Sequence, residues 1–168
     1  MKPSALVPTR PAELMIKTHK DQLVLCHRLE FIADSLPYFV DRKSCIGVAR
    51  VLGPLIQRAH KLEEEVVFPA VRDRWKALEN IDKTLERLRY EHLEDECFAE
   101  ELHDALMAYG CGDNRPGPDA FGYMLRGFFE GLRRHIAFEQ EMIVPLFSMT
   151  NTAFQTLPND PEPMQSLR

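Results

Sequence analysis

The sequence predicts an all-α protein, folded as an antiparallel up-down four-helix bundle. Apolar residues recur every three or four positions along four long segments, and no segment alternates with the period of two that a strand requires. Proline- or glycine-containing stretches separate the segments. Helices of roughly 25–35 residues with short connections favour an up-down bundle over other helical folds.

The first two expected helices carry the apolar pattern up to a proline or through one. The first covers residues 12–36 and ends before a proline. The second covers residues 41–78, and we expect Gly53-Pro54 and Pro69 to kink or break it.

The third and fourth expected helices flank the clearest loop of the chain, GCGDNRPGPD, which contains three glycines and two prolines. The third helix covers residues 79–108 and is densely charged, and the fourth covers residues 120–149. Because the connections between the four segments are short, successive helices should run antiparallel.

The expected domain organisation is simple. One helical domain covers residues 12–149, between an N-terminal extension over residues 1–11 and a flexible C-terminal tail over residues 150–168. The length of 168 residues suits one domain with a sizeable core. The tail sequence LPNDPEPMQSLR is typical of disorder.

Composition and charge exclude several classes of function. The chain is 45% hydrophobic and 28% charged, with a formal net charge of -5, which argues against nucleic acid as the main partner. No apolar run approaches the roughly 20 residues of a membrane-spanning helix, and the first residues lack the apolar segment of a signal peptide. We therefore expect a cytoplasmic protein with neither a nucleic-acid nor a membrane partner.

The four cysteines are scattered and form no C-x-x-C pair, so a cysteine zinc site is not expected. In a reducing compartment they should be free thiols. Cys26 and Cys97 fall near predicted inward positions, where a free cysteine is usually a small buried apolar residue.

A His-x-x-x-Glu motif occurs at matching points of the second and fourth expected helices. HKLEEEVVFP begins at His60, and HIAFEQEMIVPLF begins at His135. Residues four apart lie on one helix face, so His60 points the same way as Glu64, and His135 the same way as Glu139. A solvated charged face is the alternative for either motif, but the apolar residues around both favour a position beside the core.

The other two helices offer further candidates. EHLEDE contains His92 and Glu96 at the same spacing, and THKDQLVLC contains His19. The repetition across helices favours convergence of these residues on a common interior. His27 and His103 are expected outside it, because His27 is rotated off the face of His19 and His103 has no carboxylate four residues on.

Imidazole and carboxylate ligands together suit iron, manganese or zinc. Two dications roughly 3.5–4 Å apart repel each other, so bridging carboxylates are required between them. Burying so many polar groups without an ion would carry a large desolvation cost. The sequence therefore predicts a pair of metal ions, held by imidazoles and bridged by carboxylates inside the bundle.

These segments resemble the hemerythrin-like proteins of the bacterial HHE cation-binding domain type, over about residues 12–149. HKLEEEVVFP and HIAFEQEMIVPL carry most of the resemblance, and THKDQLVLC and EHLEDE add to it. The resemblance implies a non-haem di-iron centre, with zinc or manganese as alternative metals. It implies Glu64 and Glu139 as bridging carboxylates and four terminal imidazole ligands, namely His19, His60, His92 and His135. We expect the first two histidines to serve one ion and the last two the other.

The chain departs from the oxygen carriers of that family at two positions. Those proteins have a fifth histidine one turn after the helix-three histidine, where this chain has Glu96, and they tend to bridge with an aspartate where it has Glu139. A carboxylate-rich site favours oxygen activation, peroxide or nitric oxide chemistry, iron handling or sensing over plain oxygen transport. Glu96 is expected either to coordinate the His92 ion or to hydrogen-bond to one of its ligands.

Three functions stay open at this stage. The first is a metal-binding protein whose di-iron centre binds or senses oxygen, nitric oxide, peroxide or iron. The second is a di-iron oxidase or peroxidase-like enzyme, and the third is a structural bundle, with or without a single zinc or iron ion. The expected partners are a small diatomic ligand or peroxide, with a homodimer as the candidate assembly. Fingerprints for nucleotide or flavin binding are missing from the sequence.

Overall fold

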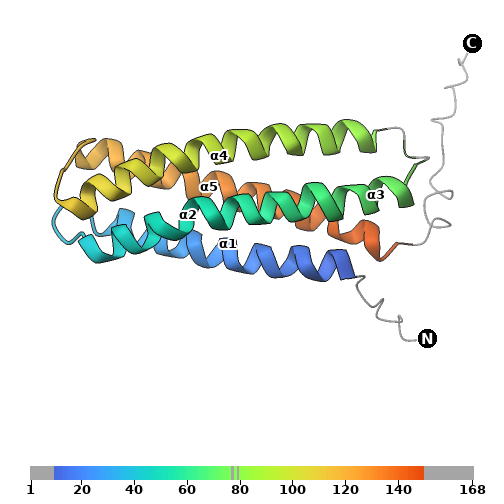
Figure 1. Ribbon diagram of the computed structural model, residues 1–168, viewed down its shortest axis with the longest axis horizontal. Coiled ribbons are helices and arrows are strands. Elements are labelled where there is room, and N and C mark those ends of the chain that lie inside the picture. Colours follow the sequence, from blue (N-terminus) through green and yellow to red (C-terminus); the bar gives the residue numbers. More distant parts are fainter. Residues whose placement is uncertain (1–9, 77, 79, 150–168) are drawn as a thin grey trace, which may run out of the picture.

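The computed structural model describes residues 10–76, 78 and 80–149, and every regular element within them is helical (Figure 1). The four long helices are α1 (Arg10–Asp34), α2 (Arg42–Leu62), α4 (Ile81–Cys111) and α5 (Pro118–Met142). A π-helical turn, Glu63–Val67, joins α2 to the short helix α3 (Phe68–Arg74), and a 3-10 turn, Val144–Phe147, follows α5. The predicted all-α fold is confirmed. The expected N-terminal extension and C-terminal tail lie almost wholly outside the described residues.

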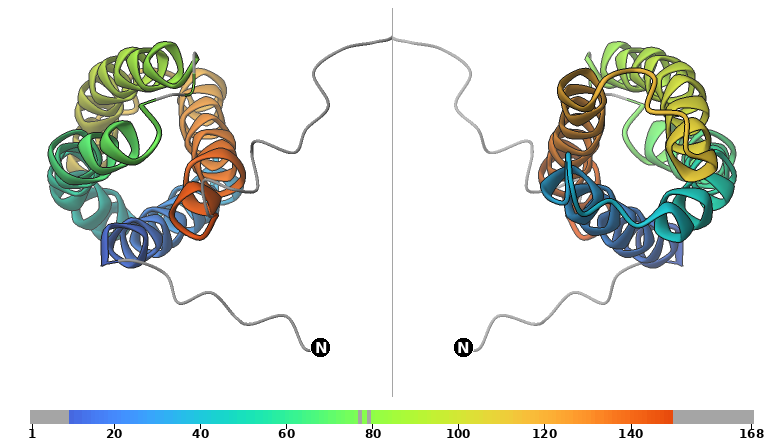
Figure 2. Two further views of the ribbon diagram at one scale, coloured as in Figure 1. Left: turned by 90° about the vertical axis from the view of Figure 1, so that its right-hand side faces the viewer. Right: turned by 90° about the vertical axis from the view of Figure 1, so that its left-hand side faces the viewer.

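The long helices run up and down in alternation and form a closed ring when viewed along the bundle (Figures 1 and 2). Helix α1 packs against α2 and α5, and α4 packs against the same two helices from the other side. All four therefore face one interior. None of the described helices is both long enough and apolar enough to cross a membrane.

Local sequence accounts for the helix ends. The side chain of Asp41 accepts hydrogen bonds from the backbone N–H groups of Lys43 and Ser44, which caps the start of α2. Helix α4 ends at Gly112, whose φ of 88° lies in the left-handed region that glycine adopts without strain.

The prolines of the second helical segment behave differently from one another. We expected a kink or a break at Gly53-Pro54, and helix α2 passes through Pro54 without breaking. Pro69 lies in the first turn of α3, where its missing N–H leaves no helical hydrogen bond unmade. The expected interruption falls just before Pro69, as a π turn rather than a break.

Two apolar clusters fill the interior, one toward each end of the bundle. The larger contains residues such as Leu52, Leu102 and Phe128, and the smaller contains residues such as Phe68 and Leu85. Helices α1 and α4 contribute buried residues to both clusters, whereas α2 and α5 contribute to the larger one and the segments that follow them contribute to the smaller. Each long helix carries a buried histidine on the side of the interior that lies between the clusters. The fold thereby sets a polar band between two apolar clusters.

All four cysteines are free thiols. Cys26 and Cys45 are buried, and burial raises the pKa of each thiol to about 11. Cys97, expected near an inward position, is exposed, because it lies beyond the edge of the apolar face that His92 and Ala99 define on α4.

Candidate metal centre

Seven polar side chains are buried in the band between the apolar clusters. They comprise one histidine from each long helix, one glutamine, and two glutamates: His19, Gln22, His60, Glu63, His92, His135 and Glu139. Glutamate side chains are almost never fully buried without a partner, so such a concentration of buried polar groups marks a candidate functional site.

The four histidines predicted from the sequence converge in this band. The rings of His60 and His92 stack with centroids 4.0 Å apart, and those of His92 and His135 lie 5.2 Å apart. His19 reaches the same band from α1 through Glu139, whose Oε2 lies 3.0 Å from His19 Nε2. Imidazoles from all four helices thus surround one interior space.

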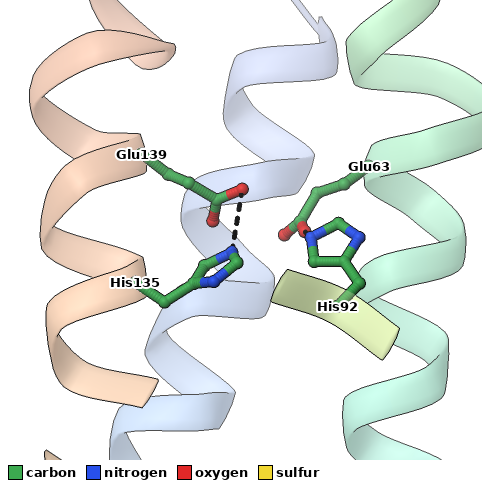
Figure 3. Close-up of side chains that lie close together, drawn as sticks. All are labelled: Glu63, His92, His135 and Glu139. Atoms are coloured by element: carbon green, nitrogen blue, oxygen red, sulfur yellow. Dashed lines mark ion pairs between the residues drawn. The ribbon is translucent and has the colours of Figure 1, made fainter. Parts of the chain in front are cut away.

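Each buried glutamate lies between two of these imidazoles. Glu139 has Oε1 3.4 Å from His135 Nε2, and its Oε2 faces His19 Nε2. Glu63 has Oε2 3.1 Å from His92 Nε2 and Oε1 3.8 Å from His19 Nε2. The two carboxylates face each other from opposite sides of the interior (Figure 3). This is the arrangement that a carboxylate bridge between two cations requires.

Glu63 occupies the interior position that the sequence predicted for Glu64. The side chain of Glu63 is 1% exposed, whereas that of Glu64 is 37% exposed. Residues three and four apart both lie on the face of His60, so spacing alone could not choose within the run of glutamates at 63–65. The π turn begins at Glu63, where the Phe68 N–H bonds to the Glu63 carbonyl five residues back, and Glu63 is the buried member of the run.

Glu96 also lies at the edge of the band rather than inside it. Its side chain is 33% exposed, and Oε1 lies 3.0 Å from His60 Nδ1. Glu64 is placed similarly, with Oε1 2.8 Å from His92 Nδ1. The structure therefore brings both residues to the site, in contact with the outer nitrogens of its histidines.

Sequence reasoning missed four residues of this region. The first is Glu63, because the sequence favoured Glu64 for the interior position. The second is Gln22, which lies one turn after His19 on the buried face of α1. Glu91 and Asp95 have carboxylate oxygens 3.5 and 3.6 Å from His135 Nδ1. The signal for Gln22 was a polar residue on an otherwise apolar face, whereas the contacts of Glu91 and Asp95 depend on the packing of α4 against α5.

His27 and His103 lie outside the site, as predicted. The side chain of His27 is 73% exposed. The His103 ring donates a hydrogen bond from Nδ1 to the Ala49 carbonyl, at 2.9 Å.

Many polar atoms in the band have no hydrogen-bond partner in the described residues. They include the Nε2 atoms of His60, His92 and His135. They also include both carboxylate oxygens of Glu63 and Oε1 of Glu139. Several lie within 4 Å of one another without the orientation of a hydrogen bond. Leaving so many buried groups unpaired would be costly unless they share a cation.

The donor atoms fit a metal ion in both spacing and chemistry. One ligand atom from each of Glu63, His92, His135 and Glu139 lies within 4.8 Å of the other three. Imidazole nitrogen and carboxylate oxygen suit iron, manganese or zinc, and no cysteine belongs to the group. The residues present therefore fit the metal that the sequence predicted.

The buried carboxylates respond in opposite ways to their surroundings in the metal-free protein. Burial raises the pKa of Glu63. Burial would also raise the pKa of Glu139, but the close contacts with His135 and His19 outweigh it and lower that pKa to about 2. Glu139 thus keeps its negative charge, while the charge of Glu63 is disfavoured.

The imidazoles divide in the same way. Burial lowers the pKa of His60 to about 3, and its neighbours His92 and His135 add to the effect. Burial would also lower the pKa of His135, but Glu139 and other nearby carboxylates raise it to about 9. The surroundings of Glu139 therefore favour a positive charge in the interior, and a cation between Glu139 and Glu63 would supply one.

The fold and this site define a cation-binding four-helix bundle. A model of the hemerythrin HHE cation binding domain matches residues 10–147. The match covers most of the chain, which therefore belongs to the hemerythrin HHE cation-binding domain family. No curated protein and no solved structure matches the chain. The family and the buried cluster of histidines and glutamates agree in assigning a metal site to the centre of the bundle.

Proposed function

We propose that the chain is a di-iron protein that binds or senses oxygen, nitric oxide, peroxide or iron. One observation carries the proposal: imidazole nitrogens and carboxylate oxygens from all four long helices and the π turn converge in a buried band and lack hydrogen-bond partners there. The bound iron pair would supply coordination and redox chemistry for a small ligand. The protein supplies the ligands, their orientation and the exclusion of water.

Two ions, rather than one, account for both oxygens of each buried glutamate. One oxygen of Glu139 faces His135 and the other faces His19. One oxygen of Glu63 faces His92 and the other faces His19. We assign His92 and His135 to one ion, and His19 to the other.

We also assign His60 to the second ion, which otherwise has a single imidazole nitrogen. The Nε2 atom of His60 is buried and unpartnered. In this assignment Glu63 and Glu139 are the bridges, and Glu63 takes the role that the sequence favoured for Glu64.

The burial of the site limits what can reach it. Its four imidazoles are all less than a tenth exposed, and apolar clusters lie on both sides of them. An organic substrate cannot contact the interior donor atoms without opening the bundle. A diatomic molecule or peroxide is small enough to pass between side chains during ordinary fluctuations. This favours a small ligand, whether it is bound, sensed or turned over.

Metal analysis tests the proposal. Protein purified after growth with iron should contain two iron ions per chain and develop near-ultraviolet absorption on exposure to air. Glu63→Gln and Glu139→Gln should lose most of the iron because each removes a bridging carboxylate. His103→Ala is the matched control and should keep two ions, because His103 hydrogen-bonds to a backbone carbonyl outside the site. Wild-type protein without bound metal would contradict the proposal, and one tightly held zinc ion would favour the structural alternative.

A separate assay distinguishes binding from catalysis. Iron-loaded protein should bind nitric oxide or oxygen reversibly, with a change in its optical spectrum. Multiple turnovers of peroxide per iron pair, faster than with equal free iron and absent in Glu139→Gln, would instead identify a peroxidase-like enzyme.

A further inference from the structure

Three of the four site histidines share a pattern that the proposed ligand set does not explain. Each turns Nε2 toward the interior, where it lacks a hydrogen-bond partner, and turns Nδ1 toward a carboxylate. The Nδ1 atoms of His60 and His92 lie 3.0 and 2.8 Å from oxygens of Glu96 and Glu64. The Nδ1 atom of His135 lies 3.5 Å from Glu91 and 3.6 Å from Asp95.

Each of these carboxylates comes from a different element than the histidine that it contacts. Helix α4 supplies Glu96 to the histidine of α2, while the π turn after α2 supplies Glu64 to the histidine of α4. Helix α4 also supplies Glu91 and Asp95 to the histidine of α5. All four carboxylates are partly exposed, whereas the imidazoles are buried. They therefore form a layer outside the imidazoles rather than part of the interior group.

The chemistry of imidazole gives this layer a role. A neutral imidazole has one N–H and one nitrogen lone pair, and an ionised carboxylate can only accept a hydrogen bond. A carboxylate at Nδ1 therefore holds the proton there and leaves the lone pair on Nε2, which is the atom that faces the interior. The same hydrogen bond makes Nε2 a stronger donor to a metal.

We infer that Glu64 and Glu96 are positioning residues, which fix the tautomer and ring orientation of His92 and His60 by hydrogen bonds and do not themselves bind the metal. Glu91 and Asp95 make no hydrogen bond to His135 and act on its Nδ1 through charge alone. This inference rests on the proposed function, because it concerns the same metal site. It replaces the expectation that Glu64 and Glu96 are ligands. It also gives a role to Glu64 of HKLEEE, beside the bridging Glu63, and to Glu96 of EHLEDE.

His19 provides the contrast within the same site. Its Nδ1 is buried without a partner in the described part of the chain, and its Nε2 contacts the bridging carboxylates directly. Among residues 10–76, 78 and 80–149, no carboxylate lies at this Nδ1 atom. We therefore expect the two ions to differ in strength of binding, with the ion at His92 and His135 held more tightly because carboxylates face the Nδ1 atoms of both of its imidazoles.

The clearest test uses Glu96, with Glu96→Ala and Glu96→Gln compared. The glutamine oxygen can still accept a hydrogen bond from His60 Nδ1, whereas alanine cannot. Glu96→Ala should bind iron about 10–100-fold more weakly but still reach two ions per chain at saturation. Glu96→Gln should restore affinity to within a few-fold of wild type. Glu100→Ala, which removes an exposed glutamate one turn further along α4, is the control and should match wild type.

A spectroscopic measurement separates positioning from general loss of structure. In zinc-loaded protein, nitrogen-15 chemical shifts of the histidine side chains report which nitrogen carries the proton. His60 should show a protonated Nδ1 in wild type and in Glu96→Gln, with a slowly exchanging proton that is lost in Glu96→Ala. Equal melting curves of the three metal-free proteins would confirm that the fold is unchanged.

Two results would overturn the inference. If Glu96→Ala binds iron as tightly as wild type, the contact with His60 has no positioning role. If Glu96→Gln and Glu96→Ala both saturate at fewer than two ions, Glu96 is a ligand. Wild-type protein that binds neither iron nor zinc would instead reject the proposed function, and so the two failures are distinguishable.

Discussion

At the scale of single residues, Glu63 and Glu139 are equally buried but differ in what compensates their charge. The side chain of each is 1% exposed. Two histidines hold the pKa of Glu139 near 2, against the effect of burial, while burial raises the pKa of Glu63. The two substitutions to glutamine should therefore affect the metal-free protein in opposite directions.

We expect Glu63→Gln to stabilise the metal-free protein. The raised pKa means that folding disfavours the charged form at neutral pH, and the neutral amide removes that cost. A gain of about 1–2 kcal/mol would raise the melting temperature by a few degrees in a chain of this length. Thermal denaturation in the presence of a chelator measures it. A melting temperature below that of wild type would show that the contact of Glu63 with His92 outweighs the desolvation cost.

We expect Glu139→Gln to destabilise the metal-free protein at neutral pH. A folded-state pKa below the ordinary value means that the charge stabilises the fold above about pH 4.5, and that this contribution is lost as the pH falls toward 2. The loss should be on the order of 1–3 kcal/mol at pH 7 and smaller at pH 3. Chemical denaturation at both pH values gives the comparison. The same loss at both pH values would point to packing rather than charge.

At the scale of elements, the π turn takes up an extra residue between α2 and α3. A π turn takes one more residue than an α-helical turn, because its hydrogen bonds join residues five apart. Before it, α2 keeps Ile56 and His60 buried, and Val67 at its end and Phe68 just after it are buried in the smaller apolar cluster. The extra residue lets both stretches face the core although the chain between them is irregular.

Deleting Glu65 should therefore preserve the fold and impair the site. Removal of one exposed residue can convert the π turn into regular α-helix while Val67 and Phe68 keep their places. We expect a nearly unchanged helical circular dichroism spectrum, with at least a tenfold loss of iron affinity because the shortened turn displaces Glu64 from Nδ1 of His92.

Deleting Gln57 is the matched control. This residue is also exposed, but it lies within regular α2, so its loss rotates the following residues by about 100°. We expect that deletion to unfold the protein or to lower its melting temperature sharply. Equal damage from both deletions would mean that the π turn does not absorb a change of register.

At the scale of the whole molecule, the metal site joins the two apolar clusters. The polar band interrupts the apolar core in all four long helices. Without a cation, the band contains unpartnered polar atoms, and with one it becomes a set of bonds between the helices. The stability of the bundle should therefore depend on the ion.

Removal of the metal should lower the melting temperature by roughly 5–10 °C. An ion at about a hundred times its dissociation constant stabilises the folded state by about 2.7 kcal/mol, and each kcal/mol shifts the melting temperature by about 2–4 °C at this size. Differential scanning calorimetry with chelator, and then with added iron, measures the loss and its recovery. The double variant Glu63→Gln, Glu139→Gln should show no shift. An equal melting temperature of the wild-type protein with and without chelator would contradict a buried metal site.

Much of the fold and part of the site could be predicted because they depend on spacing within one segment. The helical period identified four long helices, and it placed His19, His60, His92 and His135 on buried faces, as the structure has them. The same period could not choose between Glu63 and Glu64, because residues three and four along a helix share a face. The prolines predicted a kink or a break at Gly53-Pro54, and α2 continues through Pro54 unbroken.

The sequence by itself therefore determined the helical elements and the presence of one histidine on the inner face of each long helix. Hydrogen bonds within a helix fix its period locally, so these features follow from the order of residues along one segment. The tertiary structure alone decided that Glu63 turns inward, and that Glu64, Glu91, Asp95 and Glu96 each meet a histidine of another element. Those contacts depend on how helices far apart in the chain pack against each other, and no local periodicity encodes that packing.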